Sequence, residues 1–133
     1  MSLLRALVKG KGGLTRDMSA GDGFVAMPRV TTVATAGALT IGLDAILGGV
    51  AVFTGAAGAV AYTTPTAAAI IAALPHMNIG DTFVWILTNT AAQVATLTGG
   101  TGVTIAGIAT ANAASRIVVV EMTAATTLTM TGL

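Results

Sequence analysis

Residues 82–88 read Thr-Phe-Val-Trp-Ile-Leu-Thr, and this run decides the fold class. Its β-branched and aromatic side chains favour extended backbone, and the run is long enough for a central strand of a sheet. Ile79-Gly80-Asp81 stands before it as a turn signal, because Gly and Asp are common turn residues. The sequence therefore predicts a β-strand that begins near Thr82.

Short strand-like runs lie on both sides of this segment, separated by glycine-rich turn segments such as Gly48-Gly49. The runs are 30–35, 45–47, 50–53, 60–64, 94–98, 103–108, 117–122 and 127–131. Many short strands at this spacing predict an all-β fold, mainly an antiparallel sandwich or barrel. No repeat of fixed period is present, which argues against a β-solenoid.

One segment has the signals of a helix instead. Thr64 is a suitable N-cap, Pro65 occupies the favoured first helical position, and Pro75 ends the segment. The sequence predicts one short α-helix near residues 65–74. Its apolar face would cover one end of the sandwich or barrel, and it consists of Ile70, Ile71 and Leu74.

The chain divides near Met27-Pro28 into an extended N-terminal arm, residues 1–27, and a β-sandwich or barrel domain, residues 28–133. Four of the six basic residues lie in the arm, beside glycine-rich stretches that bury little apolar area. We expect the arm to become ordered on a partner, although a disordered terminus is the alternative. The candidate partner-binding residues are Leu3, Leu4, Arg5, Leu7, Lys9, Lys11 and Arg16, with Val8 as a further apolar anchor.

The scarcity of charge points to assembly. Only 8% of the residues are charged, whereas a typical soluble domain has about 25%. A surface with so few charges is poorly suited to a free monomer, because charge keeps proteins soluble and apart. We therefore expect a homo-oligomer or larger assembly in which much of the surface is buried.

The composition also argues against several classes of partner. A net charge of +1 argues against a strongly basic nucleic-acid binder, and the absence of Cys excludes disulfides and thiolate metal sites. Residues 45–80 carry no Asp, Glu, Lys or Arg, but glycines and prolines interrupt any spanning helix there. Arg5, Lys9 and Lys11 interrupt the apolar residues that a signal peptide would need. We expect neither a nucleic acid nor a membrane as partner.

The sequence contains no arrangement of residues that is typical of a catalytic site. The carboxylates are widely spaced; Asp81 fits a turn, and Glu121 is expected to pair with Arg116 or another exposed neighbour. The single histidine, His76, follows the helix-ending proline and is expected to be a turn residue or a cation near the helix C-terminus. No Gly-x-Ser-x-Gly elbow occurs. We therefore expect no enzymatic activity, no cofactor and no metal site.

The glycine run 99–102 and the two largest aromatics also have structural interpretations. Gly99-Gly100-Thr101-Gly102 lacks the Lys-Ser/Thr of a phosphate loop and precedes a strand-like run, which favours a hairpin turn. Trp85 and Tyr62 are too few for a nucleic-acid stacking ladder, so we expect them in core or interface packing.

From about Val33 onward the chain resembles small structural proteins of tailed-phage virions. The resemblance is carried by Thr63 to Pro75, by Ile79-Gly80-Asp81-Thr82-Phe83, by Thr88-Asn89-Thr90 and by Gly99 to Ile105. It follows a "TPTAAAI…P…GDSF…I.NT…GTGVT" pattern, with Thr82 in place of the usual Ser. These are turn and packing residues, and the resemblance does not extend to the arm.

Proteins of this family are mostly head decoration, or cement, proteins and sometimes fibre-associated proteins. The resemblance implies a homotrimeric β-fold on the capsid exterior that clamps neighbouring major capsid subunits, so the expected partners are other copies and the major capsid protein. The expected location is the virion, after synthesis in the host cytoplasm. The alternative is a head- or tail-fibre module that binds a host surface glycan, which the small number of aromatic residues disfavours.

Overall fold

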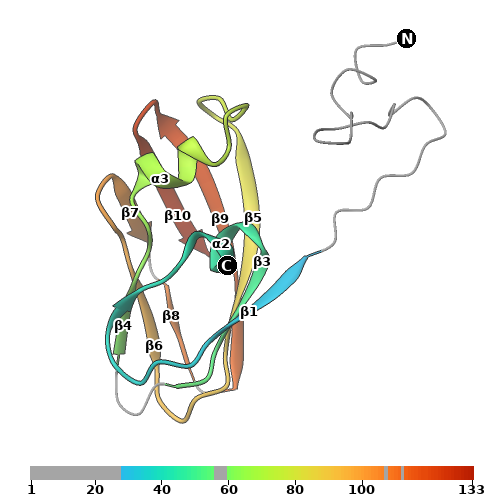
Figure 1. Ribbon diagram of the computed structural model, residues 1–133, viewed down its shortest axis with the longest axis vertical. Helices are drawn as coiled ribbons and strands as arrows, with labels where there is room; N and C mark the ends of the chain where they lie inside the picture. Colours follow the sequence, from blue (N-terminus) through green and yellow to red (C-terminus); the bar gives the residue numbers. More distant parts are fainter. Residues whose placement is uncertain (1–27, 56–59, 107, 112) are drawn as a thin grey trace, which may run out of the picture.

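The structure is a computed structural model of the 133-residue chain, and it describes residues 28–55, 60–106, 108–111 and 113–133. The predicted arm, residues 1–27, lies outside the described residues together with its seven candidate binding residues. The described part contains two β-sheets and two short helices around one hydrophobic core (Figure 1). The prediction of a β-rich fold is confirmed at this level.

The larger sheet has six strands and the smaller has four (Figure 1). In spatial order, the larger sheet consists of β1 (Arg29–Val33), β3 (Gly49–Phe53), β5 (Thr82–Asn89), β9 (Ala114–Ala124), β10 (Thr127–Gly132) and β7 (Val103–Ala106). The smaller sheet consists of β2 (Leu39–Thr40), β4 (Val60–Thr63), β6 (Ala95–Thr98) and β8 (Ala109–Thr110). The helices are α2 (Leu43–Leu47) and α3 (Ala67–Ala72).

Both sheets are mixed, so the expectation of a mainly antiparallel fold is wrong. The pairs β1–β3, β3–β5, β7–β10, β2–β4 and β4–β6 are parallel. The pairs β5–β9, β9–β10 and β6–β8 are antiparallel. The cause is the path of the chain, which passes from a strand of the larger sheet to one of the smaller and then returns. Through β6, each return brings the next strand back in the same direction, whereas β8 and β9 pair antiparallel with β6 and β5.

The first six strands therefore form a short parallel coil with two strands in each turn. The absence of a fixed-period repeat in the sequence had argued against such a solenoid-like arrangement. Val30 lies opposite Val50, 20 positions later, whereas Val50 lies opposite Ile86, 36 positions later. The second interval is longer because it includes α3 and the loop that leads to β5. Turns of unequal length have no common period, and for this reason the sequence shows none.

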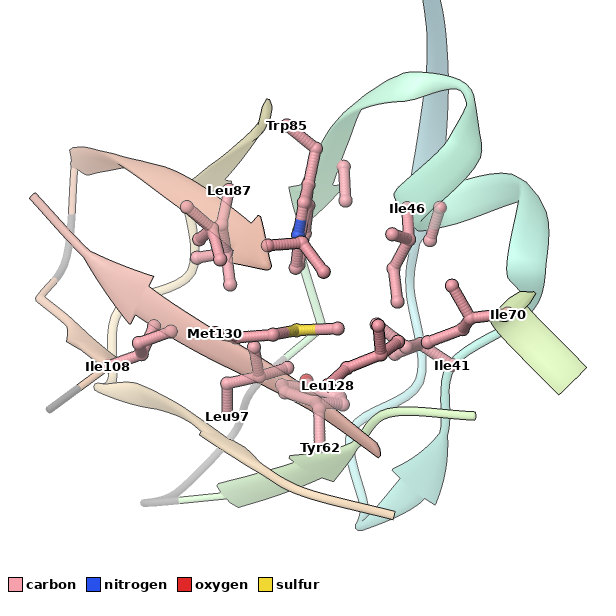
Figure 2. Close-up of a cluster of buried hydrophobic side chains, with 14 of the residues drawn as sticks. Ile41, Ile46, Tyr62, Ile70, Trp85, Leu87, Leu97, Ile108, Leu128 and Met130 are labelled. Atoms are coloured by element: carbon pink, nitrogen blue, oxygen red, sulfur yellow. The ribbon is translucent and has the colours of Figure 1, made fainter. Parts of the chain in front are cut away.

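The core lies between the two sheets and includes side chains from both (Figure 2). Burial alternates along β5, where Trp85, Leu87 and Asn89 are buried and the residues between them are not. This alternation is expected because successive side chains of a strand point to opposite faces. Trp85 is 1% exposed and is among the largest fully buried side chains, which confirms its predicted packing role.

The helices differ from the sequence prediction in number and in bounds. The expected helix at 65–74 is present as α3, but its N-cap is Thr66, whose hydroxyl accepts from Ala69 N at 3.2 Å. Thr64 is buried and instead accepts a hydrogen bond from Gly100 N. The run 45–47, expected as a strand, belongs to α2, which ends at Gly48 before Gly49 adopts φ +99°.

Tyr62 should titrate above its ordinary range in the folded protein. Its ring lies 4.4 Å from that of Phe53, its hydroxyl donates to Thr35 O at 3.0 Å, and burial raises its pKa above 10.0. Because the pKa of Tyr62 is higher in the folded than in the unfolded protein, its contribution to stability is fully present below the pKa of the unfolded state. This contribution is lost as the pH rises through the pKa of the folded state.

Because Tyr62 is the only tyrosine, phenolate absorbance reports on it alone. We expect the native protein to show less phenolate at pH 10 than the unfolded chain and to gain it together with unfolding at higher pH. The denaturant-unfolded chain, as control, should titrate near 10. A native protein that ionises reversibly near pH 10 with its fold intact would contradict this prediction.

Candidate interaction surface

Two residues with titratable side chains, Asp81 and His76, take part in a turn of the described chain. Asp81 accepts from Asn78 N through Oδ2 at 2.8 Å, and the carbonyl of His76 accepts from Asn78 Nδ2 at 3.1 Å. Both residues lie in the turn before β5, which confirms their predicted turn roles. No group of three or more metal-ligating side chains is found in the described part of the chain.

The expected Glu121–Arg116 pair does not form. Arg116 Nε donates to the carbonyl of Ala109 at 2.8 Å. Glu121 is exposed on β9, five positions from Arg116. Residues an odd number of positions apart in a strand point to opposite faces, so the two side chains cannot meet across that strand.

The glycine run 99–102 is a turn, as predicted, but not the turn of a hairpin. It joins β6 of the smaller sheet to β7 of the larger, and these two strands do not pair. Val103 N donates to Gly100 O at 2.9 Å within the turn, and Gly102 has φ +80°. A Cβ at Gly100 would lie 2.4 Å from Thr64 O, so the turn packs closely against the chain that enters α3.

The outer face of the larger sheet has the most unusual chemistry among the described surfaces. The side chains that alternate with the core residues of β1, β3, β5, β9 and β10 point away from the core. On most solvated sheets this face is polar. Here it is largely apolar over β1, β3, β5 and β9.

The apolar residues of this face align across the sheet. Val30, Val50, Ile86 and Ile117 lie opposite one another on four adjacent strands, and Leu133 N donates to the carbonyl of Ile117 at 2.9 Å. A second row pairs Val84 with Val119. We call these seven residues the apolar stripe: Val30, Val50, Val84, Ile86, Ile117, Val119 and Leu133.

Five of the seven stripe residues are exposed in the single chain, and Val50 and Val119 are half-buried. The exposed fraction is 66% for Val30, 59% for Val84, 47% for Ile117 and 70% for Leu133. Scattered exposed apolar side chains are normal, but a contiguous patch marks an interaction site or an aggregation hazard.

Hydroxyl side chains border the stripe on both sides. On one side Thr88 Oγ1 lies 2.9 Å from Ser115 Oγ. On the other, Thr82 lies opposite Glu121, which in turn lies opposite Thr129. Glu121 is the charged residue within this border among the described strands. An apolar centre with a polar rim is the usual composition of a protein–protein interface.

A hollow of about 390 Å³ interrupts the stripe where β3 begins. It lies between Pro28 and Leu47 on one side and Val84 and Ile86 on the other. A neighbouring hollow of about 600 Å³ shares Leu47 and Val84 with it and extends to the turn at His76. The face therefore has hollows into which apolar side chains of a partner can insert.

The sequence prediction located β5 but missed this surface. Residues 83–87 are apolar without a break, which favoured a central strand, and the strand is central. The chain covers one face of it and leaves the other exposed. The available signal was the lack of alternation itself, because such a strand needs cover on both faces.

Searches of family models, of curated proteins and of solved structures find no match to this chain. Among the helices that the structure describes, none has the length and apolar character to cross a lipid bilayer.

Proposed function

We propose that this chain is a capsid decoration, or cement, protein of a tailed phage that assembles as a homotrimer on the outer capsid surface. There it stabilises contacts between major capsid subunits, and the arm at residues 1–27 contacts the shell or an adjacent protomer. The proposal includes no catalytic step, cofactor or metal. Its location is the virion, after synthesis in the host cytoplasm.

The observation that carries the proposal is the exposed apolar stripe on a chain in which only 8% of the residues are charged. Both features suit a protein whose surface is covered by other protein chains. The resemblance to small virion structural proteins supplies the identity of those chains. Burial across subunit boundaries contributes about 25 cal/mol per Å² before the costs of association.

Three of the five aromatic residues are buried, which weighs against the glycan-binding alternative; of the others, Phe83 is half-buried and Phe24 lies outside the described residues. Trp85, Tyr62 and Phe53 are at most 1% exposed, so their rings are not available to stack on a sugar. The smaller sheet offers a hollow of about 550 Å³ beside Arg116, lined by Thr, Gly and aliphatic residues and no aromatic ring.

Charge reversal in the arm tests the proposed attachment. The Lys9→Glu, Lys11→Glu double variant should reduce occupancy of capsid shells by at least about tenfold, because it replaces attraction by repulsion at the rim of the contact. Shells assembled from the major capsid protein of the same gene cluster would be incubated with each variant, sedimented and assayed by gel densitometry.

Arg29→Glu is the matched control, since Arg29 is an exposed cation of the β-rich body. It should bind shells as the wild type does. Equal binding by the arm variant would contradict the role of the arm. Failure of the wild type to bind these shells would contradict the decoration function itself.

A further inference from the structure

We infer that the apolar stripe is the surface through which copies of this chain contact one another, stripe against stripe. The inference rests on the self-association in the proposed function and assigns it to particular residues. The occupant is a second copy of the chain.

The size of the face is close to the lower limit for such a contact. Six strands about 4.8 Å apart, with four rows of outward side chains about 6.7 Å apart on the longest strands, span at most roughly 24 Å by 20 Å, or on the order of 500 Å². The relief of the side chains raises the accessible area above this flat value. Stable interfaces begin at about 600 Å² per partner, so two copies would use nearly the whole face.

The composition of the face favours a like partner over an unlike one. The stripe runs through the middle of the face, with Ile86 near its centre, between two rows in which hydroxyl residues predominate; Val52 is the apolar member of the row that contains Thr88. A second copy presents the same sequence of rows, so apolar rows can meet apolar rows and hydroxyls can meet hydroxyls. A strongly charged partner would find only Glu121 to pair with along the border.

The two copies need no rearrangement of the fold to make this contact. Packed sheets lie about 10 Å apart with strands within about 30° of each other, and their inner faces interdigitate. The branched side chains of the stripe suit such packing, and the hollow beside Val84 accepts side chains that project from the opposite copy. Two copies on a twofold axis bring their stripe centres together in this way.

Single lysines in the stripe test the inference on the full-length chain. Ile117→Lys and Val84→Lys should each raise the dissociation constant of the wild-type oligomer by about 100-fold or more, because a symmetric contact places like charges together. Sedimentation velocity over a concentration series gives this constant. Ala61→Lys is the control: Ala61 is exposed on β4 of the smaller sheet, and this variant should assemble normally.

A cross-linking measurement separates loss of contact from loss of fold. The chain has no cysteine, so Ile86→Cys introduces a single reactive thiol at the stripe centre. A short bismaleimide should convert this variant to covalent dimers, while Ala61→Cys should remain uncoupled at the same concentration. Circular dichroism verifies that each variant is folded.

The possible results distinguish this inference from the proposed function. A wild-type dimer that both lysine variants dissociate supports the stripe contact and contradicts the trimer. An oligomer that both folded lysine variants preserve, or that leaves Ile86→Cys uncoupled, overturns the inference, while shell binding still decides the decoration function. A monomeric wild type at micromolar concentration overturns the stripe contact and the self-association together.

Discussion

Replacement of Trp85 by Ala is expected to lower the free energy of unfolding by about 3–5 kcal/mol, the range observed for truncation of large core side chains. Trp85 is 1% exposed and lies on β5, between β3 and β9, in a core formed by both sheets (Figure 2). Its removal leaves a large cavity that strands on two sides cannot fill. Urea denaturation followed by far-ultraviolet circular dichroism measures the loss, since the variant has no tryptophan fluorescence.

Trp85→Phe is the informative control, because the indole Nε1 is buried without a hydrogen-bond partner. Phenylalanine keeps a six-membered aromatic ring and leaves no hydrogen bond broken, but it removes part of the indole ring system together with the Nε1 donor. We expect this variant to lose about 1–2 kcal/mol, well below the alanine variant. Equal losses in the two variants would show that the ring retained in phenylalanine contributes nothing to packing, and would contradict the cavity argument.

Replacement of Asn89 by Leu is expected to lower the free energy of unfolding by about 2–5 kcal/mol. The buried Asn89 side chain donates to Gln93 O at 2.6 Å and to Thr110 O at 2.9 Å, and accepts from Ala91 N at 3.0 Å. Leucine has a similar volume but makes none of these bonds. Each buried backbone group left unpaired costs about 1–3 kcal/mol.

Asn78→Leu is the matched control for this substitution. Asn78 is exposed, and its side chain donates a single hydrogen bond to His76 O. We expect a change within about 0.5 kcal/mol, typical of an exposed site. A loss at Asn89 as small as that at Asn78 would show that the three buried bonds contribute nothing net.

The sequence predicts most strand positions because their residues have strong local preferences. Residues 60–64, 82–88 and 127–131 correspond closely to β4, β5 and β10. The prediction of a strand at residues 45–47 was wrong because three apolar residues fit a strand and a buried helical turn equally well. In α2, Ala45 and Ile46 are buried against the core, and tertiary contacts decide between the two.

The sequence does not show which strands pair with one another. A run of alternating or apolar residues indicates a strand but not the direction of its neighbour. The parallel coil depends on loops of unequal length, such as the one that carries α3. The sequence did not predict the apolar stripe for a related reason. Val84 and Ile86 have the apolar character of core residues, and only the folded sheet shows which face of β5 is left exposed. The arm residues remain predictions.

The pairing of β5 sets the order in which the polypeptide can acquire its structure during synthesis. Ile86 lies opposite Val50, 36 positions earlier, and opposite Ile117, 31 positions later. Only β9 and β10 are joined by a short hairpin, among the pairs that the structure describes. Long-range pairing slows folding toward the millisecond-to-second range. The larger sheet can therefore close only after its last strands, β9 and β10, have been synthesised.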